Sequence, residues 1–138
     1  MDKRIVNFIK EHHLLSLSTC VDNIPYISSV YYIFSKEKNS FFFSSDTNTK
    51  HVKDFIENPI VAMSIAIETK LVSNIKGLQI LGRVKSIDSD DLRIITSNYL
   101  SAFPYASNMK LNLWQIQITF VKMTDNSLGF GKKIIWEI

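Results

Sequence analysis

FFFSSDTNTKH, residues 41–51, is the stretch that decides the fold. Three phenylalanines and two serines form a short apolar strand, and Asp, Asn and Thr, the residue types that begin helices, follow at once. A short helix is therefore expected directly after the strand, with Val52, Phe55 and Ile56 on one face. Asn58-Pro59 ends this helix, because the residue before a proline avoids the helical region.

The junction between this strand and this helix carries the chemistry of an anion site. Free backbone N–H groups at a helix start attract anions. Ser44, Ser45 and Thr49 add hydroxyl donors, Lys50 adds a point charge, and His51 adds an imidazole. This donor set suits a phosphate monoester. Ordinary helix capping beside a surface lysine explains the same residues and stays open as the alternative.

The rest of the chain is rich in strands separated by short polar turns. Further helices are expected at residues 3–12, capped by Asp2, and from Ser89 to Pro104. Strands are expected at residues 14–20, 25–34, 41–45, 60–67, 78–87 and 113–123, with a last strand ending at Trp136. The nearly continuous apolar run 60–67 predicts a strand buried on both faces. The order favours a mainly β (α+β) fold, an antiparallel barrel of six to seven strands decorated by about three short helices.

Composition limits the functional classes. A chain of 138 residues fits one domain, residues 1–138, and 46% hydrophobic residues exclude disorder. No apolar run approaches the roughly 20 residues of a membrane span, and the first residues do not resemble a signal peptide. With a single cysteine, Cys20, a cytoplasmic protein is expected. The net charge of +3 is spread along the chain, so neither nucleic acid nor a membrane is an expected partner.

Isolated histidines, cysteine and glycines give weaker signals. His12 and His13 diverge by about 100° on a helix and do not chelate one metal ion, so no metal site is expected. Cys20 has no neighbouring base and is expected to be a small buried residue, not a nucleophile. Gly77 and Gly82 mark either a close approach of a ligand or the bend that a barrel needs, and both explanations stay open.

These features together resemble the pyridoxamine 5′-phosphate oxidase-like FMN-binding split barrels. The residues that carry this resemblance are Leu15 to Thr19, Pro25-Tyr26, residues 41–45, Thr49-Lys50-His51 and Asn58-Pro59. A closer resemblance, over nearly the whole chain, is to a small bacterial branch of that superfamily whose function is not established. It is carried by residues 49–51, 76–79 with Gly82, 103–106, Trp114, and 122–133 with Trp136.

The resemblance implies where a flavin would bind. Residues matching Ser44, Thr49, Lys50 and His51 hold the flavin phosphate in the oxidases, and the neighbouring Ser45 is added to this set as a hydroxyl donor. A glutamine that contacts the flavin ring in the oxidases is represented by Gln79, displaced by two residues.

Three positions depart from the oxidase pattern. Ser28 stands where the oxidases carry an arginine, Ile33 where they carry a lysine, and His51 where they carry a second lysine. Each charge-assisted hydrogen bond contributes roughly 1.5–3 kcal/mol, so losing two would weaken FMN binding by a few powers of ten. The oxidase's substrate-binding tail is absent as well, so oxidation of pyridoxamine phosphate is not expected.

The function that the resemblance implies is a small FMN-dependent oxidoreductase acting on a small molecule of unknown identity. Two alternatives stay open. One is a non-enzymatic split-barrel binding protein that has lost tight FMN binding. The other is a haem-binding or haem-degrading split barrel, with His12, His13 or His51 as axial ligand. No catalytic residue is identified from the sequence.

Two further expectations concern assembly and the C-terminal block. A homodimer is expected, because relatives build the ligand groove from two subunits and because Tyr31, Tyr32, Phe34, Trp114 and Trp136 exceed the aromatic surface that one small barrel encloses. Residues 128–136 are expected to form the closing strand, with glycines 129 and 131 leaving one face bare. One of lysines 132 and 133 is then predicted within about 10 Å of Lys50, in the same subunit or across the dimer.

Overall fold

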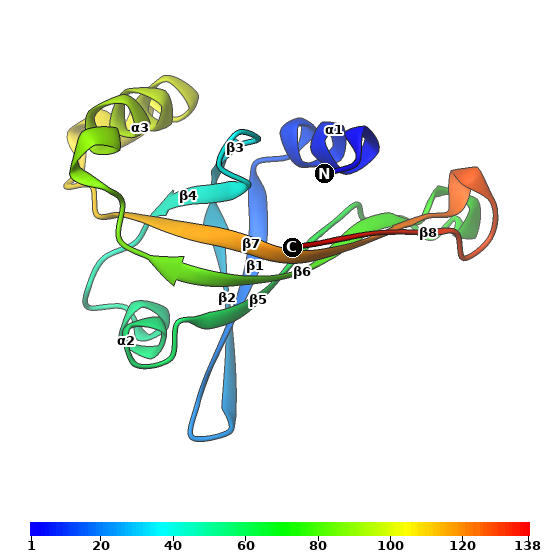
Figure 1. Ribbon diagram of the computed structural model, residues 1–138, viewed down its shortest axis with the longest axis horizontal. Helices are drawn as coiled ribbons and strands as arrows, with labels where there is room; N and C mark the ends of the chain where they lie inside the picture. The colour runs from blue at the N-terminus through cyan, green and yellow to red at the C-terminus, as the bar shows by residue number, and fades with distance from the viewer.

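The computed structural model describes residues 1–138, and eight strands form one antiparallel sheet. The strand order is β2-β1-β5-β6-β7-β4-β3, with β8 paired to the far part of β7 (Figure 1). The strands are β1 (Leu14–Val21), β2 (Ile24–Tyr31), β3 (Ile33–Ser35), β4 (Ser40–Ser44), β5 (Ile60–Ala66), β6 (Lys76–Lys85), β7 (Leu113–Asp125) and β8 (Lys133–Glu137). The helices are α1 (Lys3–Glu11), α2 (Lys50–Glu57) and α3 (Ser89–Ala102), with short 3-10 turns η1 (Val72–Asn74), η2 (Pro104–Asn108) and η3 (Asn126–Leu128).

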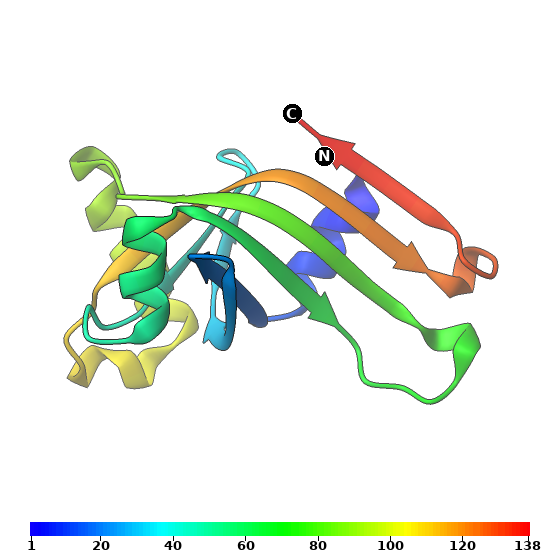
Figure 2. The same ribbon diagram turned by 90° about the horizontal axis from the view of Figure 1, so that it is seen from below.

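The sheet curls into an open half-barrel around one hydrophobic core (Figure 2). Helices α1 and α2 fill its two ends. Ile5, Phe8 and Ile9 of α1 are buried in the core. The Lys76 amine at the start of β6 lies 5.4 Å from the centre of the Phe8 ring, which places α1 beside that end of β6. At the other end, Phe55 of α2 packs 5.0 Å from the Trp114 ring at the start of β7. Helix α3 instead packs on a separate small cluster outside this core.

The cap predicted for α1 is confirmed. The Asp2 carboxylate accepts a hydrogen bond from the Arg4 backbone N–H at 2.8 Å and so caps α1. Asp22 and Asn23 have φ angles of 52° and 63°, which a two-residue hairpin turn between antiparallel strands requires. On β1, Leu15 and Leu17 are buried in the core and alternate with the half-buried Ser16 and Ser18.

The predicted strand 25–34 is in fact two strands, and this raises the count to eight. Strand β2 pairs with β1, whereas β3 pairs with β4, on the other edge of the sheet. The break falls at Tyr32, which is buried and donates its hydroxyl hydrogen to the Ile9 carbonyl at 2.7 Å. Burial raises the pKa of Tyr32 far above its usual value. Tyr32 therefore leaves the sheet to pack on α1, and the chain crosses from one edge of the sheet to the other.

A β-bulge interrupts the period-two pattern of β7. Leu81 pairs with Phe120 and Gly82 with Ile118, so Thr119 has no partner on β6. Ile118 is buried, but Phe120 is only half-buried because the bulge reverses the alternation.

The two strand glycines serve close packing within the barrel. A Cβ atom on Gly82 would lie 2.7 Å from Ile116 Cγ2 and 2.8 Å from the Gln117 carbonyl oxygen. A Cβ atom on Gly77 would lie 3.1 Å from that of Ala66. At Gly82 this supports the barrel bend, because the register of β6 against β7 shifts at the same position.

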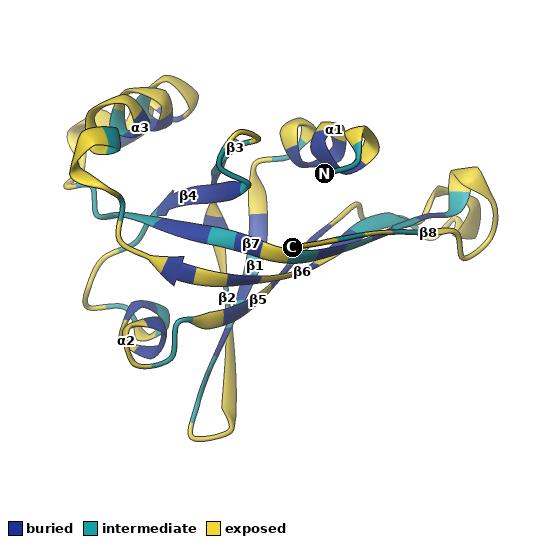
Figure 3. Cartoon of the chain, in the orientation of Figure 1, coloured by how far each residue is buried: buried dark blue, intermediate teal, exposed yellow.

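Three predicted burial patterns are wrong. Strand β5 alternates exposed and buried residues, so its outward face is open and Ile60 is 51% exposed. On α2, Ile56 is exposed and Asp54 takes a place on the buried face (Figure 3). On α3, the spacing predicts Leu92 on the apolar stripe and Ser89 at the cap, but Leu92 is exposed and the cap position is Asp88. The apolar run 60–67 therefore does not mean that both faces of β5 are buried, because no other part of the chain covers its outward face.

The C-terminal block also differs from its prediction. Gly129 and Gly131 lie in a loop with φ angles of 130° and 70°, and β8 begins only at Lys133. Lys133 pairs with Thr124, ten residues along β7 from Trp114, a separation of about 33 Å. Within one subunit the lysines therefore lie at the opposite end of the molecule from α2 (Figure 2). Proximity across two copies stays a prediction.

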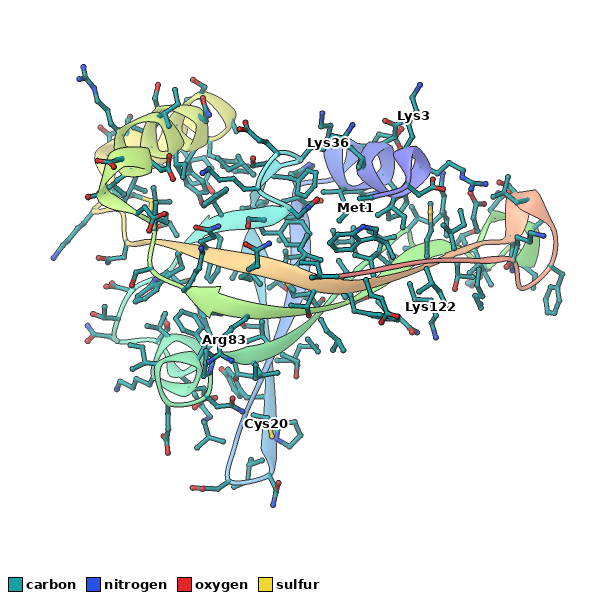
Figure 4. The ribbon with its side chains drawn as sticks, viewed as in Figure 1. Met1, Lys3, Cys20, Lys36, Arg83 and Lys122 are labelled. Atoms are coloured by element: carbon teal, nitrogen blue, oxygen red, sulfur yellow. The ribbon has the colours of Figure 1, made fainter.

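The five aromatic side chains that were the basis for predicting a homodimer are mostly enclosed within the chain. Tyr32 is buried, and Phe34, Trp114 and Trp136 pack against the core, which leaves Tyr31 exposed. Cys20 is half-buried near the tip of the β1–β2 hairpin (Figure 4). No helix combines the length and apolar character needed to cross a membrane.

Candidate functional site

A small cavity opens where β4 ends and α2 begins; we call it the α2 cavity. It has a volume of about 180 Å³. Ser44 and Ser45 enter it from the end of β4 and His51 from the first turn of α2. The remaining walls come from the end of β2, from α3 and from the segment between α3 and β7: Ser29, Val30, Tyr31, Tyr99, Tyr105, Ala106, Met109, Lys110 and Leu111.

His51 is the centre of the polar contacts in the α2 cavity. Its Nε2 lies 2.7 Å from Ser45 Oγ and 3.5 Å from Thr49 Oγ1. Burial lowers the pKa of His51, against the smaller raising effect of the Asp54 charge. The imidazole is thus neutral at neutral pH and gains a proton more readily once an anion lies beside it.

The walls around these side chains are fixed by hydrogen bonds. Ser44 Oγ accepts from the Asn112 backbone N–H at 3.1 Å, and the Trp114 indole N–H donates to the Ser45 carbonyl at 3.1 Å. These bonds tie the end of β4 to β7 and to the residues just before it. The cavity is therefore formed before any ligand enters.

Lys50 is held away from the α2 cavity. Its Nζ lies 3.0 and 3.2 Å from the two carboxylate oxygens of Asp54 and 5.2 Å from the centre of the Tyr26 ring. Asp54 is buried and accepts a further bond from Thr19 Oγ1 at 2.8 Å. Burial raises the pKa of Asp54, but the hydrogen bonds from Thr19 and Lys50 outweigh it and leave the pKa below its usual value. The Lys50 charge is thus largely neutralised within the helix.

The first turn of α2 has no side-chain cap. Thr49 occupies the cap position, but its hydroxyl donates to the Asp46 carbonyl at 2.7 Å and leaves the helix N–H groups without a side-chain acceptor. On β2, next to Ser29 of the cavity lining, the buried hydroxyl of Ser28 also lacks a partner. Unsatisfied donors around a cavity are what an anion of several oxygens would satisfy.

The structure brings together Ser44, Ser45 and His51, with Thr49 and Lys50 adjacent in the same turn. Gln79 lies elsewhere, on the exposed face of β6, opposite Ser64 and Lys122. No residue of the α2 cavity comes from that face of β6.

Three residues of this region were missed from the sequence. Asp54 follows Lys50 by four residues, and that spacing on a helix signals an ion pair. Lys110 lines the α2 cavity and takes part in no ion pair. Tyr99 also lines it, and burial raises the pKa of its phenol. Nothing local in the sequence marks Lys110 or Tyr99, since long-range folding places both.

A second and larger hollow lies between the end of α1, the β2–β3 crossing and the end of α3; we call it the α1/α3 cleft. Its volume is about 580 Å³. It shares Tyr31 and Tyr105 with the α2 cavity. The other lining residues are Ile9, Lys10, His12, His13, Tyr32, Ile33, Phe34, Ala102 and Phe103. Ile33, where the oxidases carry a lysine, thus faces this cleft and not the α2 cavity.

The curled antiparallel sheet with a helix start beside β4 defines a split β-barrel protein. The sequence profile of the family described as pyridoxamine 5′-phosphate oxidase matches residues 1–125. The chain therefore belongs to this family, as the sequence analysis predicted.

Comparison with known proteins supports both the branch and the fold. A UPF0306 protein of Photorhabdus laumondii is 32% identical over 133 residues, covering 96% of this chain and 93% of its own. A haem-binding protein of Mycobacterium smegmatis superposes with a TM-score of 0.76 at 14% identity, over 94% of this chain and 57% of its own. A FAD-binding protein of Mesorhizobium loti gives 0.70 at 14% identity, over 89% and 94%. The split-barrel fold is thus shared by proteins described with different ligands.

Proposed function

We propose that the protein binds flavin mononucleotide with the phosphate in the α2 cavity and acts as a small oxidoreductase. The observation that carries this proposal is the convergence of Ser44, Ser45 and His51 on an uncapped helix start. Hydroxyls, an imidazole and free N–H groups are donors that a phosphate accepts from. When bound, the flavin supplies electron or hydride transfer, while the protein binds and orients it.

The charge for this phosphate comes from Lys110 more than from Lys50. Lys110 lines the α2 cavity without an acidic partner, whereas the Lys50 amine is paired with Asp54. This arrangement compensates for Ser28 and Ile33, which carry no charge where the oxidases have basic residues. A single free cation still favours weaker binding than several would give.

The α2 cavity is too small for a whole flavin, and a second copy of the chain is proposed to complete the site. Its volume of about 180 Å³ lies below the roughly 300–1,000 Å³ of cofactor pockets. Ser29 lines the cavity and, by strand alternation, belongs to the outward face of the sheet. The flavin ring would therefore extend onto that face.

The outward face of the sheet suits close packing of two copies. At its centre lie the small residues Ser16, Ser18, Ala62 and Ser64, and around them the exposed apolar residues Ile27, Ile60 and Leu81. Gln79 lies on this same face. It would reach the flavin only from the partner's copy. Arg83, on the same face of β6, projects near α2 in Figure 4.

The dimer is tested by light scattering. The expected mass is about 32 kDa, twice the 15.9 kDa of the chain. Ala62→Arg places a long cation at the centre of the face, on an exposed position that the fold tolerates, and should give a monomer with weakened FMN binding. Ser97→Arg, on the exposed side of α3, is the control. A wild-type monomer at micromolar concentration would contradict the dimer.

The flavin site is tested by titrating FMN into dialysed protein and following the flavin absorbance near 450 nm. Lys110→Ala is expected to weaken FMN binding about tenfold, the loss of one charge-assisted bond. Lys36→Ala, which removes an equally exposed lysine from the β3–β4 loop (Figure 4), should leave it unchanged. Equal affinities of these two variants would show that the phosphate does not bind in the α2 cavity.

Haem is the second candidate ligand, because two of the three histidines line the α1/α3 cleft. His51 is engaged by Ser45, whereas the 2.7 Å contact of His12 Nδ1 with the Phe8 carbonyl leaves Nε2 of His12 free, so His12 and His13 are both candidate axial ligands. A Soret band that disappears in His12→Ala or in His13→Ala would favour haem. A protein that binds neither FMN nor haem would support the non-enzymatic alternative.

A further inference from the structure

The α1/α3 cleft has the dimensions and lining of a binding site for a small molecule. Its volume of about 580 Å³ falls within the range of ligand pockets, and eight of its eleven lining residues are hydrophobic. The cleft lies between two helices that pack on different clusters, α1 on the main core and α3 on the Tyr99–Phe103 cluster. Figure 1 shows the two helices flanking β3 on the same side of the sheet.

A row of aromatic rings forms one wall of this cleft. The His13 ring lies parallel to that of Tyr31, at 7° and 6.0 Å between centres. Tyr31 contacts Phe103 at 5.6 Å, and Phe103 contacts Tyr105 at 6.3 Å. Tyr31 and Tyr105 are nevertheless 45% and 57% exposed. Aromatic surface left open in a concave site favours a flat ring as its partner.

Lys10 is the one charged side chain among the residues that line the cleft. Lys10 lines it and takes part in no ion pair, and no Asp or Glu is among the lining residues. His12 and His13 contribute two imidazoles, and a hydrogen bond of His12 Nδ1 to the Phe8 carbonyl leaves its Nε2 available. A pocket of one sign of charge attracts ligands of the opposite sign. The missing partner of Lys10 is therefore an anionic group on the ligand.

We propose that the α1/α3 cleft binds a planar aromatic carboxylate, with the ring against Tyr31 and Phe103 and the carboxylate at Lys10. This inference does not rest on the flavin proposal, because none of its three contacts belongs to the phosphate-binding groups of the α2 cavity. The site is assigned from its own volume, ring geometry and charge.

The test is calorimetric titration of 2-naphthoate into the flavin-free full chain. The probe occupies only part of the cleft, and it is expected to bind one site per chain with a Kd of about 0.1 mM. The neutral analogue 2-naphthamide should bind about tenfold more weakly, since it lacks the charge that Lys10 recognises. The probe contains no metal, so ligation of iron by histidine does not contribute.

Two pairs of variants locate the site. Lys10→Ala should weaken 2-naphthoate about tenfold and leave 2-naphthamide unchanged, whereas Lys3→Ala, on the part of α1 that points away from the body (Figure 4), should change neither. Tyr31→Ala should weaken both ligands, and Tyr26→Ala, an exposed tyrosine outside the cleft, should not. Circular dichroism confirms that each variant is folded.

Absence of saturable binding up to 5 mM, a concentration about fiftyfold above the expected Kd, would overturn the proposal. Equal effects of Lys10→Ala and Lys3→Ala would overturn it too, because the carboxylate would then lie elsewhere. FMN affinity is measured separately, so failure here and failure of the α2 cavity are distinguishable.

Discussion

The α2 cavity and the α1/α3 cleft share Tyr31 and Tyr105 in their walls, yet they differ in size and in the chemistry of their lining. In the cavity, hydroxyl groups and the His51 imidazole lie together, with His51 bonded to Ser45 and Lys110 at the wall. In the cleft, eight of the eleven lining residues are hydrophobic, and the volume is about 580 Å³ against about 180 Å³. A small preformed cavity suits a fixed group such as a phosphate, and an open cleft suits a ligand that exchanges.

The difference follows from how the walls are supported. Helix α2 belongs to the main core through Val52 and Phe55. Helix α3 packs on a cluster of three buried residues and is tied to the β3–β4 loop by the Lys38–Asp91 ion pair, 2.9 Å long. Few buried contacts mean a lower free energy of local opening, so α3 is expected to be the more mobile wall.

The largest expected effect comes from the barrel that both regions share. Gly82→Ala brings a methyl group within 2.8 Å of two groups in the core and should lower the free energy of unfolding by about 2–3 kcal/mol. Both ligand sites should weaken together. Gly77→Ala, with its nearest contact at 3.1 Å, should cost less. Urea denaturation of the two variants measures this, and an equal or reversed order would contradict the packing argument.

Releasing Lys50 from its ion pair with Asp54 should place a further unpaired cation beside the α2 cavity. Asp54→Asn removes the charge that holds the Lys50 amine and should tighten FMN binding about tenfold, because a free cation then adjoins the helix start. The α1/α3 cleft should keep its affinity for 2-naphthoate. Glu57→Gln, on the exposed end of the same helix, controls for the change in net charge.

Tyr31 is predicted to affect both regions, since its ring lies between them. Tyr31→Ala should weaken FMN and 2-naphthoate by about fivefold each, the loss of one aromatic contact. Both values come from the titrations described above. A change in one ligand alone would show that the two sites do not share this wall.

The smallest expected effect is a pH dependence confined to the α2 cavity. Burial lowers the pKa of His51, and a bound phosphate raises it again, so binding takes up a proton. FMN affinity should therefore rise about threefold from pH 8 to pH 6.5. His51→Gln should remove this dependence, and a wild-type affinity that stays flat over the interval would contradict the assigned role of His51.

His51 also affects the stability of the fold, in the opposite direction: lowering the pH strengthens FMN binding but destabilises the folded chain. The folded protein resists protonation of His51 because the folded-state pKa lies below that of the unfolded chain. The contribution is fully present above about pH 6.5 and is lost as the pH falls through the folded-state pKa. The dependence of the melting temperature on pH should therefore differ between wild type and His51→Gln only below about pH 6.5.

The sequence was sufficient for the elements and for part of the site. Period-two alternation and helix-start residues predicted the helices and most of the strands. The run from Ser44 to His51 located one wall of the cavity, because these residues are neighbours in the sequence. The break at Tyr32 and the bulge at Thr119 depend on contacts with α1 and β6, which no local pattern encodes.

The lysines show the same limit at the functional site. Lys50 lies beside the helix start in the sequence, but its amine is paired with Asp54. Lys110 is sixty residues further along and reaches the α2 cavity only because the chain between α3 and β7 folds over it. Charge that arrives from distant segments is not visible as a motif.

The most direct test of the account compares FMN with riboflavin, which differ only in the phosphate. Titrated into dialysed wild-type protein, FMN is expected to bind at least about thirtyfold more tightly, the contribution of the phosphate donors of the α2 cavity. The double variant Ser45→Ala/His51→Ala should bring the two affinities close together. Equal affinities of wild type for FMN and riboflavin, or no binding of either, would contradict the central claim.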